Sequence, residues 1–113
     1  IYRFEEHKLV AVKQQWASPV TELIEELNKI GEPVTFLGDG VPVFRSMIEE
    51  KLQVPYSFAP AHVNKQRAAA VGTLGMIYYK EGRTETAMEH VPEYLRVSQA
   101  ERERAEREKA KQA

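Results

Sequence analysis

Short apolar runs that alternate with helical periodicities constrain the fold of this chain most strongly. Residues 1–4 and 9–12 have the composition of two strands joined by a charged turn, which predicts an antiparallel hairpin. A helix with one apolar face is expected at residues 20–30, and further strands are expected at residues 34–37 and 55–58. A helix should follow each of these two strands. The order strand, strand, helix, strand, helix, strand, helix predicts an α/β fold.

Proline and glycine residues indicate where these helices begin and end. Ser18 is a suitable N-cap, and Pro19 suits the first position of a helix. Gly31 is placed to cap the C-terminus of the same helix. A long helix rich in alanine and glycine is expected at residues 64–80, and one side of it is thin enough for another backbone to approach closely. Residues 84–90 are expected to form a last short helix.

The composition restricts the classes of function. A chain of 113 residues provides one domain at most. Its formal net charge of -1, from 16 basic and 17 acidic residues, argues against a protein that binds nucleic acid by itself. The sequence has no cysteine, so disulfides and thiolate chemistry are excluded, and no run approaches the ~20 apolar residues of a membrane span. We therefore expect a cytoplasmic protein without membrane contact.

The turn formed by Gly38, Asp39 and Gly40 is the candidate site for a nucleotide or another anion. A glycine turn from a strand into a helix presents backbone N–H groups at the positive end of the helix dipole. The alternative is a tight turn, in which the glycines adopt positive φ and Asp39 binds the local backbone. The plain turn is favoured because the chain has no Walker-type lysine motif, and because Pro42 removes one donor from the helix start.

Residue types that often carry catalysis do not have the spacing that catalysis needs. The histidines His7, His62 and His90 are scattered, and no pair has the i, i+4 spacing of a metal site on a helix. The paired glutamates at residues 25–26 and 49–50 point in different directions from a helix. No serine lies in the G-x-S-x-G context of a nucleophile. We expect no metal, no cofactor and no catalytic residue.

The run P-E-Y-L-R-V-S-Q-A-E-R near the C-terminus is too long and too particular to arise from periodicity alone. Its characteristic residues are Pro92, Tyr94, Leu95, Arg96, Ala100, Glu101 and Arg102. The run resembles the C-terminal signature of the TsaB (YeaZ) family, a branch of the glycoprotease-like and actin-like ATPase superfamily. The turn at residues 38–40 and the segment at residues 57–61 fit the same family, so the resemblance covers residues 35–102.

The resemblance implies a ribonuclease H-like (actin-like ATPase) domain, with a mixed sheet and flanking helices. In that unit three antiparallel strands come first, and the first of them lies in the middle of the sheet. Only two strands precede the first helix here, so the resemblance implies that residues 1–97 are an incomplete domain whose central strand lies upstream of Ile1. Residues 98–113 should form a charged tail, either disordered or helical, with Ser98 and Glu101 spaced as a capping box.

For function, the resemblance implies a non-catalytic scaffold subunit of the bacterial complex that forms N6-threonylcarbamoyladenosine in tRNA beside the anticodon. Such a subunit pairs with the catalytic paralogue TsaD and the ATPase TsaE, and it reaches tRNA only through the complex. A homodimer is also possible. The main alternative is a fragment of a glycoprotease-like (M22 peptidase-type) or nucleotide-binding enzyme. A third is an unrelated α/β binding domain that shares these turns by chance.

Overall fold

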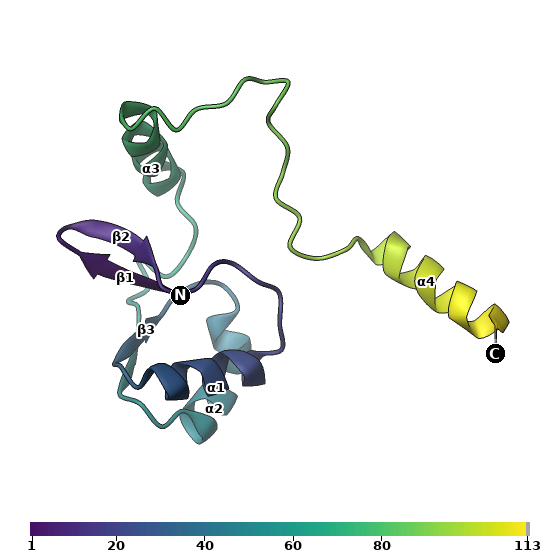
Figure 1. Cartoon of the computed structure of the whole chain (residues 1–113). Coiled ribbons are helices and arrows are strands. Elements are labelled where there is room, and N and C mark those ends of the chain that lie inside the picture. The colour runs from purple at the N-terminus through teal and green to yellow at the C-terminus, as the bar shows by residue number, and fades with distance from the viewer. Residues whose placement is uncertain (113) are drawn as a thin grey trace. The chain divides into compact units, whose positions relative to one another are not determined.

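A computed structural model of the chain describes residues 1–112 (Figure 1). Within these residues, four strands and four helices follow one another in the order β1, β2, α1, β3, α2, β4, α3, α4. The strands form two separate two-stranded sheets, so the fold is a small mixed α/β fold. This confirms the predicted α/β class and the predicted order of strands and helices, whereas the expected single mixed sheet is replaced by two separate pairs. The contacts divide the chain into two units, Ser18–His90 and a unit made of Ile1–Ala17 and Val91–Ala113.

The unit Ser18–His90 is built on two alternations of helix and strand. These elements are α1 (Val20–Ile30), β3 (Val34–Phe36), α2 (Val41–Lys51) and β4 (Tyr56–Phe58). The helices α1 and α2 lie side by side (Figure 1). In both helices, the apolar residues at helical spacing point into the interior of the unit, where a residue of β3 is also buried. The buried apolar residues are Ile24, Leu27, Phe36, Ile48 and Leu52.

Strands β3 and β4 are parallel, and α2 is the crossover that connects them. Val34 pairs with Tyr56, and Phe36 pairs with Phe58. Parallel strands cannot be joined by a tight hairpin, so the helix between them is a geometric requirement. The rings of Phe36 and Phe58 lie 5.9 Å apart between centroids, and those of Tyr56 and Phe58 lie 5.6 Å apart. The contact between Phe36 and Phe58 crosses from one strand to the other and therefore stabilises the register.

Asn28 adds a polar link between α1 and the end of α2. Its Nδ2 donates to the carbonyl of Lys51 at 3.3 Å, and its Oδ1 accepts from the N–H of Gln53 at 2.8 Å. The last carbonyls of a helix have no hydrogen-bond partner within the helix, and the N–H groups that follow the helix also need an acceptor. Asn28 satisfies one group of each kind and therefore fixes where the chain leaves α2.

The ends of α1 differ in part from the sequence prediction. The prediction of Ser18 as the N-cap is wrong, because the N-cap is Pro19, which is extended with φ −58° and ψ 145°, and no side chain caps the helix. A residue before proline avoids the helical conformation, so Ser18 lies too early to reach the first-turn amides. The cap at Gly31 is confirmed: its φ is 73°, and its N–H donates to the carbonyl of Leu27.

The third helix is shorter than predicted. Helix α3 comprises Ala68–Lys80, so it begins four residues after the predicted start at Asn64. The carbonyl of Asn64 accepts from the N–H of Gly38 at 2.8 Å, and it is therefore not available to begin a helix. The predicted helix at residues 84–90 is only a turn. Pro92 disfavours a helical residue before it, so this turn cannot continue into a helix.

The other unit contains the predicted hairpin and the charged tail. Strands β1 (Tyr2–Glu5) and β2 (Lys8–Ala11) are antiparallel, which confirms the hairpin. Glu6 and His7 have φ of 47° and 67°, as in the two-residue turns that match the twist of paired strands. The tail forms helix α4 (Gln99–Gln112).

The small core predicts a large contrast between two leucine positions in the same unit. Leu27 is 4% exposed, whereas Leu37 is 67% exposed. We expect Leu27→Ala to lower the free energy of unfolding by about 2–4 kcal/mol, through lost burial and the cavity that remains. We expect Leu37→Ala to change it by about 0.5 kcal/mol or less. Urea unfolding of both variants measures the difference, and equal effects would show that the core lies elsewhere.

Candidate functional site

The candidate anion site is the turn that connects β3 to α2. Gly38 has a φ of +114°, a conformation that side chains rarely adopt, so glycine is required here. Its N–H donates to the carbonyl of Asn64, and its own carbonyl accepts from the N–H of Val41 at 3.3 Å. Gly40 is the N-cap of α2 and has an ordinary helical φ of −74°. The prediction of positive φ is therefore confirmed for Gly38 and wrong for Gly40.

Three backbone donors at the start of α2 are already used inside the protein. The N–H groups of Val43 and Phe44 both donate to the carbonyl of Gly40, at 3.1 and 3.2 Å. The N–H of Val41 donates to the carbonyl of Gly38 within the turn, and Pro42 has no N–H. Asp39 is exposed beside this helix start and adds a negative charge. An anion would therefore meet a carboxylate and find few free donors, which favours the plain turn.

Asn64 is a residue of this turn that the sequence analysis placed in a helix instead. Besides holding Gly38 through its carbonyl, it has a buried side-chain oxygen, Oδ1, without a hydrogen-bond partner among residues 1–112. An unpaired acceptor can bind a group that donates a hydrogen bond, whereas it repels an anion. Its contact with Gly38 joins residues 26 positions apart, a distance that local sequence patterns do not report.

The signature residues fall into two neighbouring segments. Pro92, Tyr94, Leu95 and Arg96 lie in an irregular, exposed stretch, where Tyr94 is 83% exposed. The remaining three, Ala100, Glu101 and Arg102, lie in the first turn of α4. Exposed side chains in an irregular segment do not contribute to the core of their own unit, so they are accessible to other molecules.

A capping box opens α4, as the sequence predicts. The hydroxyl and the N–H of Ser98 donate to Oε2 of Glu101 at 2.8 and 2.9 Å, and the N–H of Glu101 donates back to the hydroxyl at 3.2 Å. The bonds from the hydroxyl and then from the N–H of Ser98 lower the pKa of Glu101 from its usual 4.5. Along the helix, Arg104 pairs with Glu108 at 3.0 Å. These local bonds define a helix that buries little surface.

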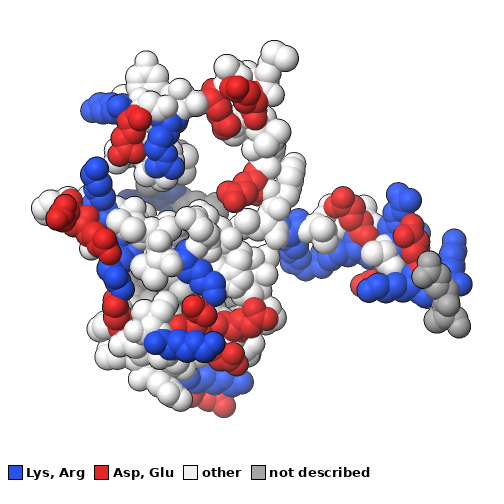
Figure 2. Space-filling model, viewed as in Figure 1, with Lys and Arg blue, Asp and Glu red and all other residues white. Residues whose placement is uncertain are grey.

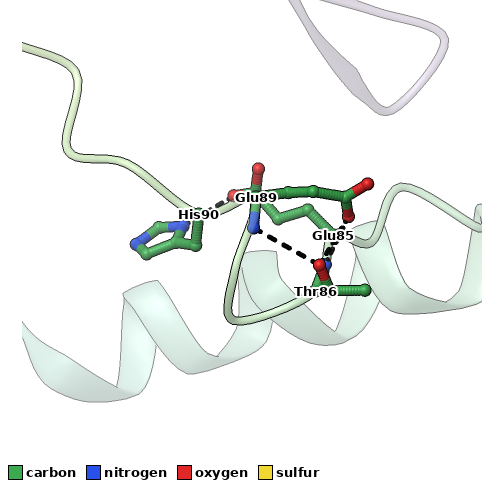
Figure 3. Close-up of polar contacts among 4 residues, drawn as sticks. All are labelled: Glu85, Thr86, Glu89 and His90. Carbon is green, nitrogen blue, oxygen red and sulfur yellow. Dashed lines mark hydrogen bonds and ion pairs between the residues drawn. The ribbon is translucent and has the colours of Figure 1, made fainter.

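A second box, which the sequence analysis missed, lies in the turn after α3 (Figure 3). The N–H and hydroxyl of Thr86 both donate to Oε2 of Glu89 at 2.8 Å, and these bonds lower the pKa of Glu89. His90 contacts Glu85 at 2.6 Å through Nδ1. The threonine-x-x-glutamate spacing is the signal that could have found this box.

The cluster of Figure 3 does not have the geometry of a catalytic site. A hydroxyl nucleophile needs a base within hydrogen-bonding distance. Thr86 instead donates to Glu89, whose pKa is lowered and which is therefore a weak base, while His90 faces Glu85. All four residues are exposed. The cluster closes one turn of backbone and needs no ligand to do so.

The remaining surface carries both signs of charge. Basic and acidic side chains are interspersed over the face shown in Figure 2, including α4. Within residues 1–112, no three histidine, aspartate or glutamate side chains gather in a group that could hold a metal ion. None of the helices described there has both the length and the apolar character needed to cross a bilayer.

No protein-family model matches this sequence, and comparison with curated proteins and with solved structures also gives no match.

The two glycines of the candidate turn should respond differently to alanine. Gly38→Ala should lower the free energy of unfolding by about 1–2 kcal/mol, because its backbone is left-handed. Gly40→Ala should leave stability unchanged or raise it by about 0.4–1 kcal/mol, because its φ suits any residue. Neither new Cβ would clash, since only Phe44 at 3.9 Å approaches either one. Chemical denaturation of both variants measures the contrast, and equal losses would contradict the turn geometry.

The capping box predicts the direction of a pH effect on α4. The pKa of Glu101 is lower in the helix than in the unfolded chain. Its contribution to the stability of α4 is therefore complete above pH 4.5 and is lost as the pH falls through the lowered pKa. NMR titration of the chain should find Glu101 titrating below 4.5. Ser98→Ala should return the pKa towards that value, whereas Thr86→Ala should leave it unchanged. A Glu101 pKa that is insensitive to Ser98→Ala would rule out the box in solution.

Proposed function

We propose that this chain belongs to a non-catalytic scaffold subunit, similar to TsaB, of the bacterial complex that forms N6-threonylcarbamoyladenosine in tRNA. The observation that supports the proposal is the run from Pro92 to Arg102, which resembles the C-terminal signature of that family. The capping box accounts physically for Ser98 and Glu101. It does not account for Tyr94, Leu95 and Arg96, which precede the box.

The exposed part of the signature supports a role in protein contacts. Tyr94, Leu95 and Val97 are 83%, 46% and 60% exposed. Apolar and aromatic side chains that gather outside a core mark surfaces for other proteins, and tyrosine and arginine are enriched among the residues that dominate binding. We therefore propose that residues 92–97 contact a TsaD-like or TsaE-like partner, and that tRNA is reached through that partner.

For the complete sheet we propose the ribonuclease H-like arrangement. In such a sheet a central strand joins an antiparallel pair to a parallel pair. The hairpin β1–β2 and the pair β3–β4 have these two directions, in this order along the chain. A two-stranded sheet alone is marginally stable, so a strand that joined the two pairs would stabilise both.

Two observations weigh against the enzyme alternatives. At the Gly38 turn, the N–H groups of Gly38, Val41, Val43 and Phe44 are bound to the protein's own carbonyls, which leaves few donors for a nucleotide phosphate. In the cluster of Figure 3, the hydroxyl of Thr86 faces a carboxylate of lowered pKa and has no histidine beside it. A peptidase-type reaction needs an activated nucleophile or a metal-bound water, and neither arrangement supplies one.

Reconstitution of the tRNA modification tests the proposal. TsaD-like and TsaE-like proteins, threonylcarbamoyl-adenylate and tRNA are incubated with and without the protein that carries this chain. We expect modified adenosine, measured by mass spectrometry, to fall to background without it. Tyr94→Ala should weaken partner affinity by about tenfold or more, as for an interface residue that dominates binding. Met88→Ala is the matched control, because Met88 is 97% exposed and lies outside the signature.

Full modification in the absence of the protein would contradict the scaffold role. Saturable binding of ATP to the protein alone, measured by titration calorimetry, would favour the nucleotide-binding alternative.

A further inference from the structure

The segment of residues 91–97 connects the turn after α3 to α4. Within residues 1–112, none of its backbone N–H or carbonyl groups takes part in a hydrogen bond. Bonded backbone ends before it at His90, whose N–H donates to Thr86, and resumes after it at Ser98, whose carbonyl accepts from Arg102. A run of free donors and acceptors can pair with the open edge of a sheet, because such an edge presents the same groups.

The side chains of this segment favour an extended conformation. Val91, Tyr94 and Val97 are of the β-branched and aromatic types that are enriched in strands. They are 73%, 83% and 60% exposed, so no core contact is lost when the segment rearranges. The segment is irregular, with a bend at residues 95–96, and pairing as a strand requires this bend to straighten.

Two other common ways of binding a short segment fit these residues less well. A helix docked in a groove would have to extend α4 backwards, but the capping box at Ser98 ends that helix on its N-terminal side. Recognition of a polyproline helix uses repeated prolines, and this segment has Pro92 alone. Addition of a strand to a sheet remains, and it uses the unpaired backbone itself.

Pro92 determines which side of such a strand faces the partner. The N–H groups of successive residues in a strand point alternately to its two sides, and proline has no N–H. A proline in a strand therefore occupies a position whose N–H side faces solvent. With Pro92 in such a position, the N–H groups of Tyr94 and Arg96 also face solvent. Those of Leu95 and Val97 face the partner.

We propose that residues 93–97 dock as an added β-strand on the open sheet edge of a partner subunit, with the N–H groups of Leu95 and Val97 bonded to that edge. Side chains alternate between the two faces of a strand, so Leu95 and Val97 share one face and Tyr94 and Arg96 share the other. The partner's edge should therefore be apolar on the face that meets Leu95 and Val97. This inference rests on the proposed function, because it specifies how residues 92–97 bind the partner named there.

Amide exchange followed by NMR tests the alternation without any substitution. The isotope-labelled protein that carries this chain is measured alone and with the TsaD-like or TsaE-like protein. In the free protein the amides of residues 93–97 should exchange rapidly, because they are exposed and not bonded. In the complex, those of Leu95 and Val97 should exchange at least about tenfold more slowly than those of Tyr94 and Arg96.

Methylation of a single backbone nitrogen tests the same bonds through affinity, because it removes one donor and leaves every side chain in place. The chain has no cysteine, so synthetic residues 87–113 can be ligated through a cysteine at Ala87 that is afterwards desulfurised to alanine. Methylation at Leu95 should weaken partner binding by about tenfold or more, because a bonded donor is lost. Methylation at Arg96 is the matched control and should weaken binding by less than about threefold.

The outcomes separate this inference from the proposed function. If a partner binds but protection is uniform across residues 93–97, or methylation at Arg96 weakens binding as much as methylation at Leu95, the added strand is wrong and the scaffold role stands. If neither partner protein binds, the proposed function is contradicted, and this inference falls with it.

Discussion

The structure depends on one small apolar core, where α1, β3 and α2 meet. Five side chains supply the buried apolar residues of the described chain, and they come from residues 24–52. This core fixes the angle between the helices and the exit from β3, and it thereby positions the Gly38 turn. Burial drives folding in proportion to the apolar area removed from water, so a core of this size stabilises only the elements that contribute to it.

Apolar surface outside the core connects the fold to the proposed functions. The hairpin exposes Phe4, α3 exposes Val71, and the signature exposes Tyr94. Phe4 and Val71 belong to elements with their own local hydrogen bonds, Tyr94 lies in an irregular stretch, and none of the three side chains is buried. Such surfaces gain stability when another protein covers them. The proposed function assigns a partner subunit to residues 92–97.

Local features could be predicted from the sequence, and long-range ones could not. The element order, the cap at Gly31 and the box at Ser98 follow from residues within a few positions of one another. The late start of α3 depends on the bond between Asn64 and Gly38, which joins distant segments. For the candidate site, the sequence located the turn correctly. It could not show that the N–H groups of Val41, Val43 and Phe44 are already bonded, because that depends on backbone geometry.

Hydrogen exchange measured by mass spectrometry tests most directly whether α1, β3, α2 and β4 form the stable core while the other apolar surfaces await partners. In dilute solution, the account predicts slow exchange in α1, β3 and α2, and fast exchange in residues 81–97 and α4. Protection of residues 92–97 should rise on addition of a TsaD-like partner. Protection of α3, residues 92–97 and α4 equal to that of the core in dilute solution would contradict it. The chain would then be one cooperative unit that covers its own apolar surface.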